Sequence, residues 1–128
     1  MTINLDQLAQ DLKSIVGENH VYSDVIERLN YAETILPYDI VEEDLPDVVV
    51  QPANTEEVSE VLQYANKHEI PVTTFGSGTS GMYGTKPKHR GITMSCERLN
   101  FLRIDEDSQW LECGPGARTG YVIKELEK

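Results

Sequence analysis

The sequence predicts an α+β fold with α/β character: a small, partly parallel sheet that contains a βαβ unit and is flanked by helices. The main observation is a β-branched run at 47–51, an amphipathic pattern at 54–65 and a second strand pattern at 70–75. Strand, helix and strand in this order form a βαβ unit, whose two strands run parallel. Further short apolar stretches between 91 and 113 predict additional strands.

The first helical pattern lies near the N-terminus. Asn4 can cap this helix with Gln7 reaching back to the cap, and Gly17 can end it. A shorter helix is expected after Ser23, and the prolines and acidic residues of 37–46 predict an extended connection. The apolar stripe of the first helix consists of Leu5, Leu8, Ala9, Leu12, Ile15 and Val16.

The centre of the sequence gives the clearest pattern. The run 47–51 is apolar on both faces, as in a buried parallel strand, and Pro52 ends it. Asn54 and Glu57 form a capping-box pattern at the start of the next helix. The sequence returns to strand character at 70–75. The helix carries apolar residues at i, i+3, i+4 and i+7, namely Val58, Val61, Leu62 and Ala65.

The last third of the chain predicts shorter elements. A third strand is expected at 91–95, followed by two strands at 99–104 and 109–113 that a turn at 106–108 joins. Thr119 can then cap a final helix.

Composition narrows the classes of partner. The 128 residues include 22 acidic and 11 basic side chains, for a formal net charge of -11. Nucleic acid and anionic membranes demand a basic face, so neither is expected as the main partner. No apolar run is long enough to span a bilayer, and nothing marks the N-terminus for secretion. Two cysteines without CxxC spacing and three scattered histidines predict no metal site and a reducing, cytoplasmic location.

A glycine-rich stretch, TTFGSGTSGMYGTKP at 73–87, follows the second strand of the βαβ unit. Ligands of open α/β sheets bind beyond the carboxyl ends of the parallel strands. Glycines allow backbone N–H groups to approach an anion closely, and hydroxyl side chains add donors. The stretch therefore predicts a phosphate or pyrophosphate site. The alternative is an exposed loop that glycine makes flexible and that binds nothing.

Two familiar phosphate loops do not fit this stretch. GSGTSG at 76–81 matches the GxGxxG fingerprint of dinucleotide-binding Rossmann folds, but that fingerprint must open directly into a helix. The residues that follow, 82–87, contain a glycine and a proline and show no helical stripe. A Walker A loop fails as well, because Met82 stands where its lysine is required.

A third loop fits better. Residues 71–80 resemble the first flavin loop of the FAD-linked oxidases related to p-cresol methylhydroxylase and vanillyl-alcohol oxidase, in the branch of glycolate oxidase and D-lactate dehydrogenase. The resemblance extends over about 31–128, since 47–58, 99–105 and Gly114-Pro115-Gly116 match the family in order and spacing. It implies an N-terminal helical extension at 1–45 and the first FAD-binding subdomain at 46–128. The second subdomain and the substrate domain would be absent.

In this family the backbone amides of the loop hold the pyrophosphate of FAD. Phe75 stands where the family often has a polar residue, and residues 81–83 depart from its usual Leu-Ser-Gly. Members with covalent flavin have a histidine at the position of Thr79, so the resemblance implies non-covalent FAD. The residues that it assigns to the cofactor are Phe75, Gly76, Ser77, Gly78, Thr79, Ser80 and Gly84.

The resemblance implies the N-terminal FAD-binding portion of a flavin-dependent oxidoreductase that oxidises a 2-hydroxy acid such as glycolate or D-lactate. No residue is assigned a catalytic role, and the isolated chain is expected to bind FAD weakly or not at all, because one loop cannot enclose the flavin ring. Expected partners are the remaining subdomains of a longer parent and a second copy of the chain. The alternative is a non-catalytic remnant or interaction module that keeps the fold without binding flavin. A basic cluster at 86–90 could offset repulsion between the dinucleotide and the acidic protein.

Overall fold

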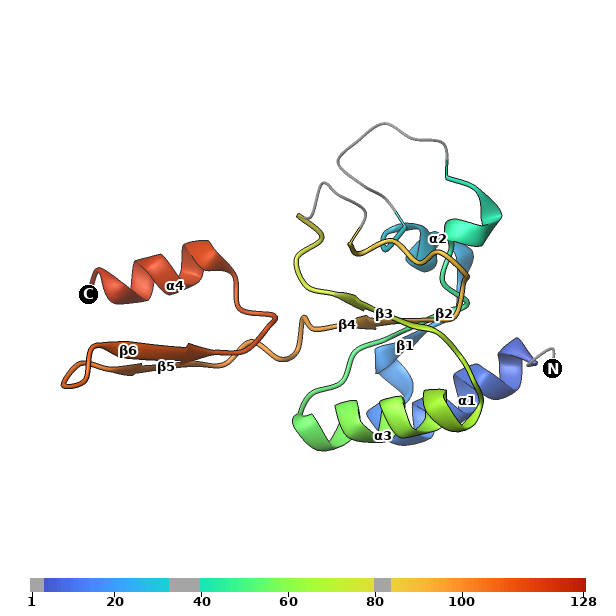
Figure 1. The fold of residues 1–128 in the computed structure, drawn as a ribbon, viewed down its shortest axis with the longest axis horizontal. Coiled ribbons are helices and arrows are strands. Elements are labelled where there is room, and N and C mark those ends of the chain that lie inside the picture. The colour runs from blue at the N-terminus through green and yellow to red at the C-terminus, as the bar shows by residue number, and fades with distance from the viewer. Residues whose placement is uncertain (1–3, 33–39, 80–83) are drawn as a thin grey trace.

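The computed structural model describes residues 4–32, 40–79 and 84–128 (Figure 1). A four-stranded sheet with its helices forms the larger part, and a two-stranded sheet with a C-terminal helix forms the smaller. The elements in chain order are α1 (Leu5–Val16), the 3-10 turn η1 (Glu18–His20), β1 (Val21–Tyr22), α2 (Val25–Leu29), the 3-10 turn η2 (Glu42–Asp44), β2 (Val48–Val50), α3 (Thr55–Lys67), β3 (Val72–Phe75), β4 (Ile92–Ser95), β5 (Leu102–Asp105), β6 (Trp110–Cys113) and α4 (Thr119–Leu126).

The larger sheet has the strand order β1-β2-β4-β3. Strands β2, β4 and β3 run parallel, and β1 pairs antiparallel with β2. The chain passes from β2 through α3 to β3, and β4 then inserts between them, with Thr93 facing Val49 on one side and Thr73 on the other. The predicted α+β fold with a partly parallel sheet is confirmed.

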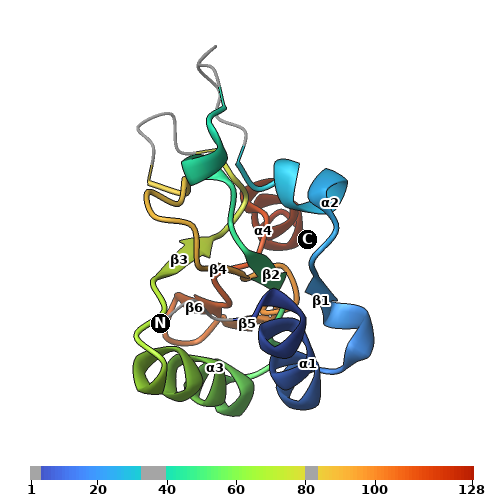
Figure 2. The same ribbon diagram turned by 90° about the vertical axis from the view of Figure 1, so that its right-hand side faces the viewer.

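Helices α1 and α3 cover the same face of this sheet (Figures 1 and 2). Their apolar stripes meet the buried side of the strands, because every third or fourth residue of each helix points the same way. The core is made of Leu8, Ala9, Leu12, Val16, Val21, Val48, Val50, Val61, Ala65, Ile92 and Met94.

The two ends of α1 agree only in part with the capping residues predicted from the sequence. The Asn4 side chain accepts a hydrogen bond from the Asp6 N–H at 2.9 Å, and Gly17 ends the helix with φ +91°. Gln7 does not reach back to the cap. Its amide instead donates to Asp11 Oδ1 at 2.7 Å, one turn further along the helix.

The start of α3 also differs slightly from the expected capping box. Asn54 Oδ1 accepts from the Glu57 N–H at 2.8 Å, as predicted. The Glu57 carboxylate accepts from the backbone N–H of Ala53 at 2.7 Å, one residue before the cap. Both contacts satisfy backbone donors at the helix entry, so α3 begins where the pattern places it.

The described N-terminal residues 4–32 pack against the rest of the fold. Besides α1, they contribute β1 to the sheet, and Val21 of this strand joins the core. The short helix after Ser23 is present as α2, with Asp24 as its N-cap. The sequence did not predict β1, which has only two residues.

A hydrogen bond joins α1 to α3. The Tyr64 hydroxyl donates to Asp11 Oδ2 at 2.8 Å. Burial, followed by this bond, raises the pKa of Tyr64 to about 12. The same bond is the main cause that lowers the pKa of Asp11. The contact therefore favours a protonated tyrosine beside an ionised carboxylate.

These shifts predict how stability depends on pH. Since the pKa of Tyr64 is raised on folding, its contribution is complete below pH 10 and is lost as pH rises from 10 towards 12. Asp11 acts in the opposite sense, and its contribution is lost as pH falls through its lowered pKa. We expect Tyr64→Phe to flatten the fall in unfolding free energy between pH 10 and 12, measured by urea denaturation at a series of pH values. Tyr121→Phe is the control, because Tyr121 is exposed on α4 and leaves the Asp11–Tyr64 bond intact. Equal slopes for all three proteins would contradict the prediction.

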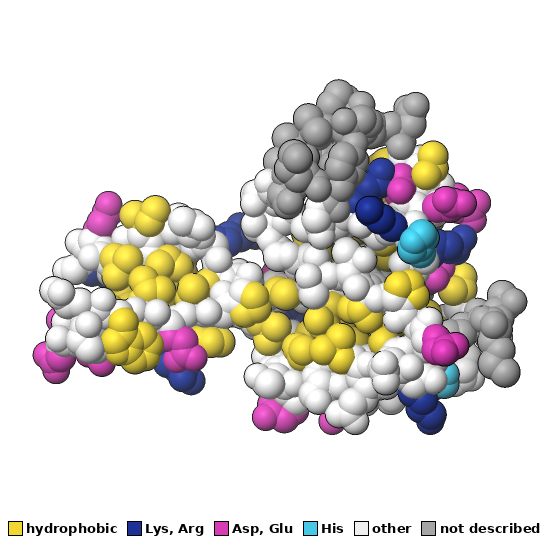
Figure 3. Space-filling view, in the orientation of Figure 1, with side chains coloured by type: hydrophobic (Ala, Val, Ile, Leu, Met, Phe, Trp, Pro, Cys, Tyr) yellow, Lys and Arg dark blue, Asp and Glu magenta, His cyan; other side chains and the backbone are white. Residues whose placement is uncertain are grey.

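The hairpin β5-β6 and helix α4 extend away from the larger sheet (Figure 1). The predicted strands and final helix are confirmed, although the N-cap of α4 is Arg118, which makes no side-chain capping bond. None of the residues of α4 is buried. Figure 3 shows apolar side chains gathered on this part of the molecule. Large exposed hydrophobic residues here are Phe101, Ile104, Trp110, Leu111, Tyr121, Ile123 and Leu126.

Within the ranges that the structure describes, every helix is too short or too polar to pass through a bilayer.

Candidate functional site

The glycine-rich stretch leaves the sheet at the carboxyl end of β3. Residues 76–78 form bends, none of 76–79 is helical, and Gly76, Ser77 and Thr79 are exposed. In the part of the chain that the structure describes, no N–H of 76–79 donates a hydrogen bond to another protein group. These donors are available to a ligand, which is what an anion site at the tip of a parallel strand requires.

Phe75 gives the loop its shape. Its ring packs edge-on against Tyr31 with centroids 4.8 Å apart. Gly78 has φ +70°, and a Cβ at this position would lie 2.6 Å from the Phe75 ring. The loop therefore folds back over the aromatic ring and requires a glycine at the point of contact. The hydroxyl groups of Ser77 and Thr79 lie 3.2 Å apart in this turn.

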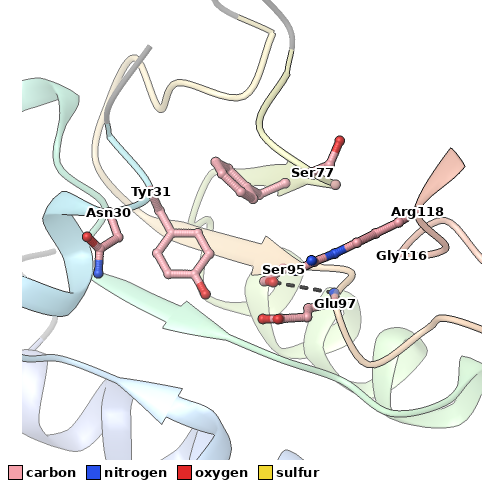
Figure 4. A pocket seen from close by; sticks show the side chains of 9 residues that line it. Asn30, Tyr31, Ser77, Ser95, Glu97, Gly116 and Arg118 are labelled. Atoms are coloured by element: carbon pink, nitrogen blue, oxygen red, sulfur yellow. Dashed lines mark hydrogen bonds between the residues drawn. The ribbon is translucent and has the colours of Figure 1, made fainter. Parts of the chain in front are cut away.

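A pocket of about 290 Å³ opens beside the loop (Figure 4). It lies where β3 and β4 end, because Gly76 and Ser77 follow β3 and Ser95 is the last residue of β4. The lining residues are Asn30, Tyr31, Phe75, Gly76, Ser77, Ser95, Glu97, Gly116 and Arg118.

The structure brings part of the predicted set together. Phe75, Gly76 and Ser77 line the pocket, while Gly78 and Thr79 continue the same loop without lining it. Ser80 lies outside the described residues. The assignment of this set to the cofactor stays a prediction.

Gly84 lies in a different place. It borders a second hollow along β3, together with the basic residues Lys86, Lys88 and Arg90. Arg90 pairs with Asp47 at 2.7 Å and with Glu42 at 2.9 Å, and the bond to Asp47 is the main cause that raises the pKa of Arg90.

Lys86 likewise pairs with Asp44 at 2.6 Å. Because carboxylates already neutralise Lys86 and Arg90, the basic cluster can offset less of a ligand's charge than its sequence indicates.

Several pocket residues were not predicted from the sequence. Glu97 follows the parallel strand β4, so the rule that ligands bind at carboxyl ends could have indicated it. Arg118 follows the Gly-Pro-Gly turn and offers a cation, but only the fold shows which side of the sheet it reaches. No pattern in the sequence indicated that Tyr31 lies at the pocket, since it is distant from β3 in the sequence and contacts Phe75 only in the folded chain.

A hydrogen-bonded network centred on Gln51 holds two of the pocket residues, Tyr31 and Glu97. The side chain of Gln51, which is buried, donates to Glu97 Oε2 at 3.1 Å and to the Tyr31 hydroxyl at 3.2 Å. Tyr22 donates to Gln51 Oε1 at 3.0 Å. Arg98 donates to the Gln51 carbonyl at 2.7 Å. Glu97 is thereby held in place at the pocket edge.

The arrangement suits binding better than acid–base or nucleophilic catalysis. Cys96 follows β4, but burial raises the pKa of its thiol and disfavours the reactive thiolate. Glu97 is bound by a neutral amide, and the lining that the described residues form contains no second carboxylate and no histidine. The donors that the described loop and pocket offer include backbone amides, the hydroxyl groups of Ser77 and Thr79, and the Arg118 guanidinium. Such donors fit a phosphorylated ligand.

These features define an α+β domain with an open pocket at the carboxyl edge of its parallel strands, which is a candidate site for an anion. Comparison with known families then identifies it: the chain belongs to the FAD binding domain family, whose model matches residues 46–128. FAD is therefore the cofactor of the domain, and the exposed glycine loop with unused amides fits the pyrophosphate of this group.

Two curated relatives are named for reactions of hydroxy acids. A D-lactate dehydrogenase of Archaeoglobus fulgidus is 44% identical over 80 residues, which are 62% of this chain and 17% of that protein. The glycolate oxidase subunit GlcD of Bacillus subtilis is 34% identical over 86 residues, 66% of this chain and 18% of that protein. The chain thus spans less than one fifth of these relatives.

The fold is also similar to that of a solved structure. Substrate-bound p-cresol methylhydroxylase superimposes with a TM-score of 0.85 at 20% identity, over 95% of this chain and 24% of that one. This similarity confirms the p-cresol methylhydroxylase type of FAD-binding fold expected from the sequence.

Proposed function

We propose that this chain is the N-terminal FAD-binding portion of a flavin-dependent oxidoreductase, and that the loop 75–80 holds the pyrophosphate of FAD. The observation that carries the proposal is the set of unused N–H groups at 76–79, placed beside a pocket at the end of β3. In this reading residues 1–45 are the N-terminal extension and 46–128 the first flavin subdomain.

The site indicates which part of the reaction depends on FAD and which on the residues of this chain. Bound FAD supplies a ring system that accepts two electrons from an organic substrate. The chain supplies binding: amides of 76–79 receive the diphosphate, and the ring of Phe75 supports the turn at Gly78. Because Thr79 stands where a covalent attachment would need a histidine, we propose that FAD is held without a covalent bond.

A 2-hydroxy acid such as glycolate or D-lactate is the proposed substrate of the longer parent. The support is the similarity to two proteins named for these activities, at 44% and 34% identity. Within the described residues the loop pocket offers no acid–base pair, so we propose that other parts of the parent bind the substrate.

The cysteines and the exposed hydrophobic residues bear on the compartment and on the protein partners. Cys96 and Cys113 are both unpaired, which suits a reducing compartment, and we propose a cytoplasmic location. The exposed hydrophobic residues of the hairpin and α4 make further subdomains of the parent, or a second copy of the chain, the expected protein partners.

Nuclear magnetic resonance tests the proposed loop function, since it detects weak binding. We expect the amide resonances of 76–79 to shift when FAD is added to the isotope-labelled chain. Gly78→Ala should raise the Kd about tenfold, because the added Cβ meets Phe75 and turns the donors away from the ligand. Flavin should leave the chain completely after denaturation in urea.

The matched control is Gly17→Ala. Gly17 also has a positive φ, +91°, but it lies at the end of α1, away from the loop. Both variants place alanine at a positive φ, and only Gly78→Ala should lose FAD affinity. Resonances of 76–79 that stay unchanged at millimolar FAD would contradict the proposal and favour a non-catalytic remnant.

A further inference from the structure

Arg118 differs from every other arginine of this chain in its contacts. Arg28 donates to the Pro46 carbonyl at 2.6 Å, and Arg90 is paired with two carboxylates. Arg98 donates to the Gln51 carbonyl, and Arg103 pairs with Glu112 at 3.1 Å. Across the described residues, only the guanidinium of Arg118 has neither a hydrogen bond nor an ion pair. Its five N–H donors are therefore available to a ligand.

The position of Arg118 is set by the backbone that precedes it. The Gly116 N–H donates to the Leu99 carbonyl at 2.9 Å, and the α-carbon of Gly116 lies so close to the Cys96 carbonyl that an added Cβ would be 1.9 Å from its oxygen. These contacts hold the start of α4 against the end of β4. Figure 4 shows the Arg118 side chain extending from this segment into the pocket towards Ser95.

Arg118 also stands where two hollows meet. One is the 290 Å³ pocket beside Gly76 and Ser77. The other has a volume of about 400 Å³, is lined by Asn100 and Tyr121, and shares Glu97, Gly116 and Arg118 with the first. An elongated ligand that occupies both hollows would pass the guanidinium.

The charge balance of the loop pocket requires a cation at this point. Among the described residues that line this pocket, Glu97 is the one carboxylate and Arg118 the one cation. Without Arg118, a diphosphate entering the pocket would meet neutral donors and a negative side chain in a chain of net charge -11. A planar guanidinium can bind two phosphate oxygens at once, which makes it the best-suited side chain for this role.

We infer that Arg118 pairs with the diphosphate of FAD from the side opposite the glycine loop, and so fixes where the dinucleotide crosses the sheet edge. This inference rests on the proposed function. It adds a specific cation, contributed by the segment before α4, to a site that the sequence assigned to the loop alone.

The test compares Arg118→Gln with Arg103→Gln, a control arginine that is exposed on β5 and remote from the pocket. FAD, ADP and riboflavin are titrated into each isotope-labelled chain. We expect Arg118→Gln to raise the Kd for FAD and for ADP about tenfold, with a weaker dependence on salt. Riboflavin, which carries no phosphate, should bind each protein alike, and Arg118→Lys should recover part of the affinity.

The outcomes separate the inference from the function on which it rests. Equal FAD and ADP affinities for wild type and Arg118→Gln, with 76–79 still shifting, would overturn the role of Arg118 and leave the loop function intact. If 76–79 do not respond to FAD in the wild-type chain, the proposed function and the inference both fail. Arg118 is exposed, so spectra of the variant should keep the dispersion of a folded chain.

Discussion

Leu12→Ala is expected to lower the free energy of unfolding by about 2–5 kcal/mol. Leu12 is fully buried on α1 and belongs to the core cluster that includes Val48, Val50 and Val61. Removing three carbon atoms loses their transfer free energy and leaves a cavity, because helices packed on a sheet relax only partly. The loss would be a large fraction of the stability of a small domain.

Leu5→Ala is the matched control, since it makes the same change on the same helix. Leu5 is 42% exposed in the first turn of α1, so little buried area and no cavity are involved. Urea denaturation followed by circular dichroism should give a much lower midpoint for Leu12→Ala and an unchanged slope. Losses of similar size at both positions would show that α1 is not packed on the sheet in solution.

The local elements of this fold could be predicted because their signals are local. The three valines of β2 are β-branched and buried on both faces, and α3 combines a cap at Asn54 with an uninterrupted apolar stripe. Strand β1 escaped notice because two residues carry no periodicity. The insertion of β4 between β2 and β3 is likewise invisible locally, since it depends on which strands pair over long range.

The residues of the candidate site likewise divide into those that local sequence predicts and those that only the fold reveals. Gly76 and Ser77 could be placed at the pocket because they directly follow a predicted parallel strand. Gly84, which the family pattern grouped with them, borders another hollow along the strand edge. Tyr31 and Arg118 come to the pocket from segments far from β3 in the sequence, so only tertiary packing brings them there. The sequence therefore indicated the donors of the glycine-rich loop, whereas Tyr31 and Arg118 could be found only from the fold.

Gly116→Ala is expected to destabilise the protein by about 1–3 kcal/mol and to weaken FAD binding. An added Cβ would lie 1.9 Å from the Cys96 carbonyl oxygen and 3.1 Å from that of Glu97. Both contacts are with backbone, which cannot rotate away as a side chain can. Relief requires the segment before α4 to move off the end of β4, and this movement would carry Arg118 out of the pocket.

Gly120→Ala separates this steric effect from the general effect of replacing a glycine. Gly120 lies within α4, and an added Cβ meets nothing within 4 Å. Alanine is the better helix former, so this variant should gain about 0.5–1 kcal/mol. Thermal unfolding should therefore move the two midpoints in opposite directions, and FAD titration should show a loss only for Gly116→Ala. A Gly116→Ala protein as stable as wild type would mean that β4 and the segment before α4 are not in contact. In that case Arg118 could not line the pocket as described, because the close approach of Gly116 to the Cys96 carbonyl is what places the Arg118 segment there.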